Sequence, residues 1–153
     1  MEQLKWVFKT FGNLTPDELY AILQLRNEVF VVEQNCVFQD ADNKDQPSHH
    51  LMSWEGNKLL AYTRIVPAGI SYAEPSIGRV VVLPAARKRH LGKTLMQKSI
   101  EMLRNLYGPA GIRIGAQLYL KSFYESLGFQ QTSPVYIEDG IQHIEMFLNP
   151  GSS

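Results

Sequence analysis

One stretch of the sequence, residues 80–94, constrains the fold more than any other, because an apolar run passes through a basic segment directly into an amphipathic helix. Val80–Leu83 is apolar without alternation, which predicts a central strand covered on both faces. Apolar residues then recur at helical spacing over 91–107, until Gly108 ends the pattern. The stretch therefore predicts a strand, a basic loop and a long helix within a mixed α/β domain.

The rest of the chain supports the same fold class. Thr15 and Glu18 flank Pro16 as a capping box, which predicts a helix from there to about Glu33. Residues 35–48 are polar and rich in turn formers, so we expect a loop. Strands are expected at 5–8, 50–54, 59–66, 77–83, 112–116 and 141–148, with another before the Asp139-Gly140 turn, and a short helix at 120–127. We expect one domain over 1–150 and a disordered tail at 151–153.

Charge and composition exclude several classes of protein. Fifteen basic residues balance fifteen acidic ones among 153, so no overall field draws the molecule to nucleic acid or to a membrane surface. No apolar run approaches the roughly 20 residues needed to span a bilayer, and no leader is evident. The single Cys36 cannot form an internal disulfide. These observations predict a cytoplasmic protein.

The start of the 91–107 helix is a candidate phosphate site. A helix N-terminus offers unpaired N–H groups and the positive end of the dipole. Arg87, Lys88, Arg89 and Lys93 surround it, and Gly92 allows a ligand close to the backbone. These residues favour a diphosphate or polyanion site, against the alternative of a solvated basic helix start. Neither the P-loop pattern nor the dinucleotide fingerprint is present.

Two motifs carry a resemblance to a known family. The run from Val82 through Arg87, His90 and Gly92 resembles the coenzyme A pyrophosphate loop of the GNAT superfamily of N-acetyltransferases, whose pattern is Gln/Arg-x-x-Gly-x-Gly/Ala. Gln117–Phe129, with its Phe-Tyr-Glu-x-Leu-Gly-Phe end, resembles the second GNAT signature. Nearly the whole chain resembles the ElaA-type branch, through Phe30–Gln34, Gly78–Val82 and Glu138–Ile144.

The resemblance implies a fold and an activity. The fold would be the GNAT acyl-coenzyme A N-acyltransferase fold, with a central, mixed, mostly antiparallel sheet of about six or seven strands flanked by three to four helices. The activity would be direct transfer of an acetyl group from acetyl-coenzyme A, as cosubstrate, to the primary amine of a small molecule or a protein. A non-catalytic acyl-coenzyme A-binding regulatory module is the alternative.

The resemblance also assigns residues to the cofactor and to the chemistry. Backbone groups of Val81 and Val82 would bind the thioester carbonyl and pantetheine, and Val80 would belong to the same cofactor site. Gln117 would contact the pantetheine arm, Phe123 would also belong to the cofactor site, and Tyr124 would protonate the departing thiolate. The residues alone favour a core aromatic at Tyr124, and it is the resemblance that raises the catalytic role to an equal alternative. The pyrophosphate would be held by Arg87, Lys88, Arg89, His90, Leu91, Gly92, Lys93 and Thr94.

His90 departs from the family pattern, which has glycine at that position. If the position requires a positive φ, a histidine there carries a steric cost that glycine avoids. The imidazole could also contribute a contact to a phosphate.

The general base is less strongly indicated than the acid. Glu33, His50, Glu138 and His143 flank the places where acceptor loops should gather, and we take Glu33 and His143 as catalytic candidates. Arg79 lies in an apolar strand and needs a partner if buried. It could bind an acceptor carboxylate or pair with Glu33 or Asp45, and we favour the structural pairing.

No metal site is expected. His49 and His50 are adjacent on a strand, so they point to opposite faces and cannot readily share one ion. Cys36 follows a helix C-terminus, where the dipole disfavours a thiolate, so it is interpreted as a bystander thiol.

The acceptor is not specified by any motif. Loops at 33–48, 67–76 and 133–143 are expected to shape its site, and the acidic first loop (Glu33, Asp40, Asp42, Asp45) favours a cationic acceptor. A phosphate- or nucleic-acid-binding domain is disfavoured, because the basic residues are confined to one short loop. The protein is expected to be a monomer or a homodimer.

Overall fold

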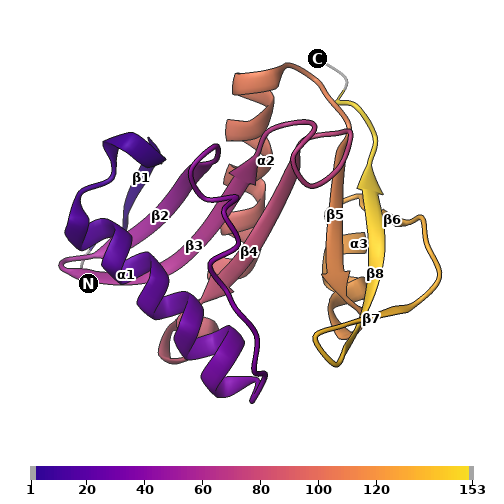
Figure 1. The fold of residues 1–153 in the computed structure, drawn as a ribbon. Coiled ribbons are helices and arrows are strands. Elements are labelled where there is room, and N and C mark those ends of the chain that lie inside the picture. The colour runs from indigo at the N-terminus through magenta and orange to yellow at the C-terminus, as the bar shows by residue number, and fades with distance from the viewer. Residues whose placement is uncertain (1–2, 152–153) are drawn as a thin grey trace.

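Two antiparallel sheets form the frame of the structure, a computed structural model that describes residues 3–151 (Figure 1). The elements are β1 (Lys5–Thr10), η1 (Phe11–Asn13), α1 (Pro16–Arg26), η2 (Asn27–Glu33), β2 (His49–Glu55), β3 (Lys58–Val66), β4 (Ser76–Val82), η3 (Pro84–Arg89), α2 (Leu91–Tyr107), β5 (Ile112–Gln117), η4 (Leu118–Leu120), α3 (Lys121–Glu125), β6 (Gln130–Gln131), β7 (Tyr136–Glu138) and β8 (Ile141–Leu148). The predicted mixed α/β class is confirmed.

β4 and β5 are not paired as a ladder, and the division between them separates the two sheets. The first half has the strand order β1-β2-β3-β4, and the second pairs β8 with β5, β6 and β7. β4 and β5 lie side by side where they begin, and the Arg113 N–H donates to the Pro75 carbonyl at 3.2 Å. Figure 1 shows the two strands running in the same direction and diverging toward their ends. This divergence opens the centre of the molecule.

The expectation of a central strand at Val80–Leu83 is partly corrected. Val81 packs against the α1 side, and Val80 and Val82 against the α2 side, so both faces are covered as predicted. Among residues 3–151, however, the only strand that pairs with it is β3. An apolar run indicates that both faces of a strand are covered, but it does not indicate whether another strand pairs with each edge. Backbone hydrogen bonding between strands does not depend on side-chain polarity.

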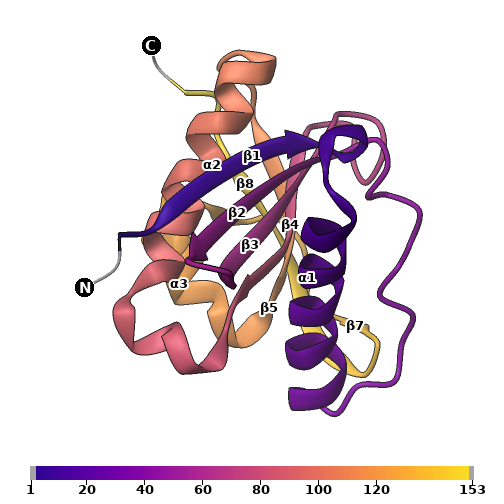
Figure 2. The ribbon, with the colours of Figure 1, turned by 90° about the vertical axis from the view of Figure 1, so that its left-hand side faces the viewer.

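Helices α1 and α2 lie on opposite faces of the first sheet (Figure 2). Leu95, Met96 and Leu103 of α2 are fully buried against the strands. Ile22 and Leu25 bury the other face beneath α1. Burying each such side chain contributes about 1.5–3 kcal/mol, so the two helices hold the first sheet rigidly around the split.

The predicted first helix is confirmed at its start and altered at its end. The Thr15 side chain accepts from the Glu18 N–H at 3.1 Å, and the Thr15 N–H donates to the Glu18 carboxylate at 2.8 Å. Helical structure continues to Glu33 as predicted, but beyond Arg26 it is a π-helix. Such wider turns are frequent at functional sites, and this one delivers Glu33 to the central opening.

The remaining predicted strands and helices are present, with small differences at their ends. The two-residue β6 was not predicted, because it is too short to show any periodicity. Of the predicted tail at 151–153, Ser152 and Ser153 lie outside the described residues, and Gly151 has no regular structure. No helix within residues 3–151 is both long enough and apolar enough to cross a bilayer.

Candidate active site

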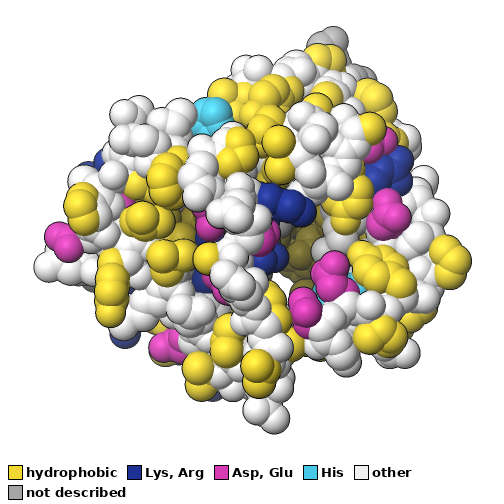
Figure 3. All heavy atoms as spheres, in the orientation of Figure 1, with side chains coloured by type: hydrophobic (Ala, Val, Ile, Leu, Met, Phe, Trp, Pro, Cys, Tyr) yellow, Lys and Arg dark blue, Asp and Glu magenta, His cyan; other side chains and the backbone are white. Residues whose placement is uncertain are grey.

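A cavity of about 1230 Å³ fills the opening between β4 and β5. Figure 3 shows it as a hollow in the face of the molecule, with Lys and Arg side chains on one side and Asp and Glu on the other. All three segments expected to shape the acceptor site, 33–48, 67–76 and 133–143, contribute to its lining. So do the ends of β4 and β5 and helix α3. The cavity is thus the place where the predicted site residues can meet.

A bulge in β4 turns backbone groups out of the sheet. The register passes from Tyr62 opposite Val81 to Arg64 opposite Gly78, so two residues of β4 face one residue of β3. Arg79 in the bulge has a φ of 50°. A bulge leaves its extra residue unpaired in the ladder, and the bulged strand lines the cavity. The bulge was not predicted, although Gly78 within a strand pattern is a recognised signal for one.

The basic loop is a 3-10 turn, η3, joined to α2 by a single left-handed residue. That residue is His90, at φ 57° and ψ 33°. The position therefore does have the positive φ at which a histidine carries a steric cost that glycine avoids. The N–H groups at the start of α2 have no partner within the helix. Gly92, one residue into the helix, lies where an added methyl group would be 3.7 Å from the Phe123 ring.

The left-handed geometry of His90 predicts a reversal in the usual ranking of substitutions. We expect His90→Gly to exceed His90→Val in free energy of unfolding by about 1–2 kcal/mol, because glycine avoids the clash that a β-branched residue meets there. At the exposed helical Glu101 the order should invert, valine exceeding glycine. Urea titration of the four variants measures both differences. A His90→Val protein as stable as His90→Gly contradicts the strain.

The structure brings some of the predicted cofactor residues to the cavity and leaves others outside it. Eight of them line it: Val80, Val81, Val82, Arg87, Gly92, Gln117, Phe123 and Tyr124. Six are not among its lining residues: Lys88, Arg89, His90, Leu91, Lys93 and Thr94. Arg89 forms an ion pair with Glu55 at 2.8 Å, and Leu91 packs with Leu60 and Ala86. Lys88 and Lys93 of this second group are exposed, so they can meet an anion at the cavity's outer edge.

The end of η2 bridges the two sides of the opening. Glu33 accepts two hydrogen bonds from Arg87, at 2.9 and 2.5 Å. Gln34 and Gln117 exchange side-chain hydrogen bonds at 3.2 and 3.4 Å. The Arg87 hydrogen bonds hold the pKa of Glu33 below its ordinary value, so this carboxylate is charged and paired.

Tyr124 lies at the inner wall of the cavity. It belongs to α3, is 6% exposed, and packs edge-on against Phe123 and Phe129 with ring centroids 5.1 and 5.9 Å away. Burial raises the pKa of its hydroxyl well above the ordinary value. The hydroxyl therefore keeps its proton at neutral pH, which is the state required of a proton donor.

His143 lines the cavity from β8. Its Nδ1 lies 2.8 Å from the Ile141 carbonyl, and because a carbonyl only accepts, Nδ1 carries the proton. Nε2 is therefore an acceptor in the neutral ring, 3.7 Å from the Glu138 carboxylate. His143 is paired in register with Gln117 of β5, so it lies beside the end of that strand. This geometry fits a base.

His50 has a structural position. It is fully buried and is not among the cavity-lining residues. Tyr62 donates to Nδ1 at 2.6 Å, and Nε2 donates to the Asp45 carbonyl at 2.9 Å. Both ring nitrogens are thus occupied within the fold.

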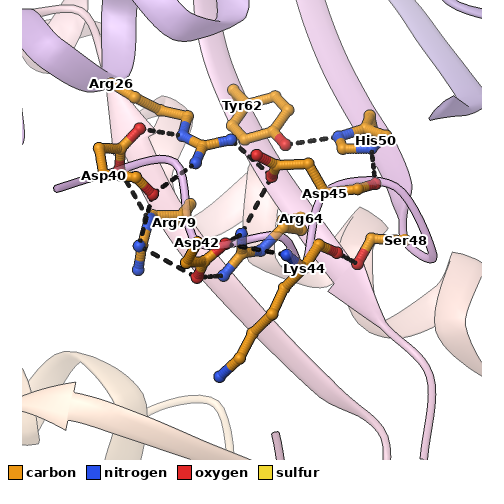
Figure 4. A network of polar contacts seen from close by, with 10 residues as sticks. All are labelled: Arg26, Asp40, Asp42, Lys44, Asp45, Ser48, His50, Tyr62, Arg64 and Arg79. Carbon is orange, nitrogen blue, oxygen red and sulfur yellow. Dashed lines mark hydrogen bonds and ion pairs between the residues drawn. The ribbon is translucent and has the colours of Figure 1, made fainter. Parts of the chain in front are cut away.

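The predicted partners of Arg79 are corrected. Arg79 binds Asp40 at 2.8 Å and Asp42 at 3.3 Å, not Glu33 or Asp45 (Figure 4). Asp45 instead joins Arg26 and Arg64. A structural pairing was expected, but its partners depend on the path of the 35–48 loop, which no local pattern fixes. The three aspartates of that loop are therefore neutralised internally rather than offered to a cationic acceptor.

Cys36 is buried, and its thiol donates to the Asp139 carbonyl at 3.1 Å. Across residues 3–151, no cluster of three or more His, Cys, Asp and Glu side chains is arranged to hold a metal ion.

Comparison with known proteins identifies the family. The profile of the acetyltransferase (GNAT) domain family matches residues 17–149. The chain therefore belongs to the GNAT family of acyl-coenzyme A N-acyltransferases.

Within that family the chain belongs to the ElaA-type branch. It is 40% identical to the protein ElaA of Escherichia coli, over 94% of this chain and 95% of that one. The crystal structure of that ElaA superposes with a TM-score of 0.90 at 38% identity, covering 96% of this chain and 100% of the other. An acyl-CoA N-acyltransferase from Pseudomonas aeruginosa superposes with a TM-score of 0.91 at 41% identity, covering 95% and 99%.

Proposed function

We propose that this protein is an N-acetyltransferase that transfers the acetyl group of acetyl-coenzyme A directly to a primary amine. One observation supports this above all. A single cavity is lined by a bulged strand, a basic residue just before a helix start, a protonated buried tyrosine and a histidine whose Nδ1 is bound to a backbone carbonyl. Family membership makes an acyl-coenzyme A the expected cosubstrate.

The residues of the cavity fit the parts of acetyl-coenzyme A. Arg87 and the N–H groups at the start of α2 suit the pyrophosphate, with Arg89, Lys88 and Lys93 close in sequence. The bulged β4 offers backbone groups to the thioester carbonyl and the pantetheine amides. Gln117 and Phe123 face the same space. For Arg87 and Gln117 to bind, the contacts to Glu33 and Gln34 must give way, so cosubstrate binding is coupled to movement of η2.

The proposed reaction is an acyl transfer with two assisted proton transfers, one from the attacking amine and one to the departing sulfur. His143 Nε2 accepts a proton from the ammonium, so that the neutral amine can attack the thioester carbon. As the carbon–sulfur bond breaks, the Tyr124 hydroxyl donates its proton to the departing sulfur. The proton that the new amide nitrogen must lose passes through solvent and restores the Tyr124 hydroxyl. Each positioned acid or base contributes roughly 10²–10⁴-fold in rate. Orienting the amine against the thioester between β4 and β5 adds to this. Glu33, paired with Arg87, remains the second candidate for the base.

The test is turnover with the purified full chain. Incubated with acetyl-coenzyme A and a panel of primary amines, the protein should release free coenzyme A thiol together with an equal amount of N-acetylated amine, identified by mass spectrometry. Acetyl-coenzyme A binding without acetylation of any amine across the panel would contradict the proposal and favour a non-catalytic acyl-coenzyme A-binding module.

A further inference from the structure

The two halves of the cavity carry opposite charge. Its basic lining residues, Lys44, Arg64, Arg79 and Arg87, all precede β5 in the chain. Three of its five acidic lining residues, Glu138, Asp139 and Glu145, follow β5 on the opposite side. The same division is visible in Figure 3, where dark blue and magenta side chains flank the hollow. A ligand lying across the opening therefore meets a positive side and a negative side.

The positive side has one charge, that of Lys44, that no ion pair among residues 3–151 neutralises. In the network of Figure 4, Asp40, Asp42 and Asp45 are matched by Arg26, Arg64 and Arg79. The remaining cation is Lys44, whose ammonium points away from the network and makes none of the contacts drawn there. Lys44 lines the cavity.

The arginines on this side also retain donors. Arg79 uses Nε and Nη2 for its contacts with Asp40 and Asp42, and Nη1 takes part in none of them. Arg64 is 3% exposed, and within the described part of the chain its buried Nε has no hydrogen-bond partner. Buried donors without acceptors are costly. The three aspartates do not supply an acceptor for every donor of these arginines. An anion bound by Lys44 and Arg79 supplies further acceptors.

Two tyrosines, Tyr72 and Tyr136, line the negative side of the cavity. Burial first, and then the neighbouring Tyr136, Glu145 and Glu138, raise the pKa of Tyr72. Both hydroxyls approach Gly115 of β5, where an added methyl group would be 2.9 and 3.0 Å from them. Glu138 lies 3.7 Å from His143. A cationic amine is attracted here, next to the base that must deprotonate it.

We infer that the acceptor is a small zwitterion, an amine that also carries a carboxylate. The ammonium lies on the side of Glu138, Glu145 and His143, and the carboxylate lies on the side of Lys44 and Arg79. The inference rests on the proposed function and specifies its substrate class. It differs from the expectation of a simple cationic acceptor, because the aspartates on which that expectation rested form ion pairs with arginines.

The test compares matched amines. α-Amino acids and ω-amino acids of increasing chain length are assayed beside their own carboxamides, which differ only in the missing negative charge, and beside diamines. We expect kcat/KM to be at least about tenfold higher for the best carboxylate than for its carboxamide, the usual effect of a charged hydrogen bond. Lys44→Gln should remove most of that advantage by lowering kcat/KM for the carboxylates toward the value for their carboxamides. The exposed Lys5→Gln, on the outermost strand, should change neither.

A charge reversal gives a second readout. Lys44→Glu should raise kcat/KM for diamines above that of the unmodified protein while lowering it for amino acids. If carboxamides or diamines are acetylated as well as amino acids by the unmodified protein, the inference is wrong and the proposed function stands. If no amine is acetylated, both are wrong.

Discussion

Replacing Tyr124 with phenylalanine is expected to lower kcat by roughly 10²-fold or more while leaving the Kd for acetyl-coenzyme A within about twofold. The substitution removes only the hydroxyl, and the ring keeps its edge-on packing with Phe123 and Phe129. Without that proton the sulfur must leave as a bare thiolate from a buried site, which is costly. Steady-state kinetics and calorimetric titration measure the two quantities separately.

The matched control for this loss is Tyr107→Phe at the end of α2, which does not line the cavity. It should leave kcat and Kd unchanged. Equal turnover of the Tyr124→Phe and unmodified proteins would remove the hydroxyl from the mechanism. A parallel loss of binding would show instead that the residue supports the cavity wall.

Arg26→Met is expected to lower the free energy of unfolding by about 3–5 kcal/mol. Arg26 is completely buried and binds the carboxylates of Asp40 and Asp45 at 2.8 and 2.7 Å. The methionine fills much of the same volume but leaves two buried carboxylates with fewer donors. Because Arg64 and Arg79 still contact these aspartates, the loss should fall toward the lower end of that range.

Lys9→Met provides the comparison for a partly exposed ion pair. Lys9 contacts Glu18 at 2.9 Å with 31% of its side chain exposed. Its loss should cost no more than about 1 kcal/mol, because solvent screens such a pair. Urea denaturation followed by circular dichroism measures both variants. Equal effects at the two positions would mean that the buried network contributes no more than a surface contact.

The sequence predicted the parts of the fold that local signals control. The capping box at Thr15, the amphipathic pattern of α2 and the turn at Asp139-Gly140 each act over a few residues, and each is found where it was expected. The positive φ of His90 was raised only as a condition, because glycine at that family position is compatible with a left-handed backbone but does not require one.

The features that build the cavity were harder to foresee because they depend on distant parts of the chain. The separation of β4 from β5 cannot be seen in the pattern of polar and apolar side chains. The partners of Arg79 come from a loop about 40 residues earlier, whose path is set by its ion pairs rather than by any turn motif. The change to a π-helix after Arg26 likewise accompanies a buried cation whose partners lie 14 and 19 residues away. In the sequence, such contacts are visible only as charged residues whose partners cannot be identified.

The central claim, that the cavity binds acetyl-coenzyme A, is tested most directly by isothermal titration of acetyl-coenzyme A into the purified protein and into a variant with Arg87→Ala and Arg89→Ala. The control variant carries Lys5→Ala and Arg104→Ala, two basic residues that do not line the cavity. We predict saturable binding to the unmodified and control proteins, and binding about tenfold or more weaker in the Arg87/Arg89 variant, because charge-assisted hydrogen bonds to the pyrophosphate are lost. No binding to the unmodified protein, or equal binding to all three, would contradict the claim.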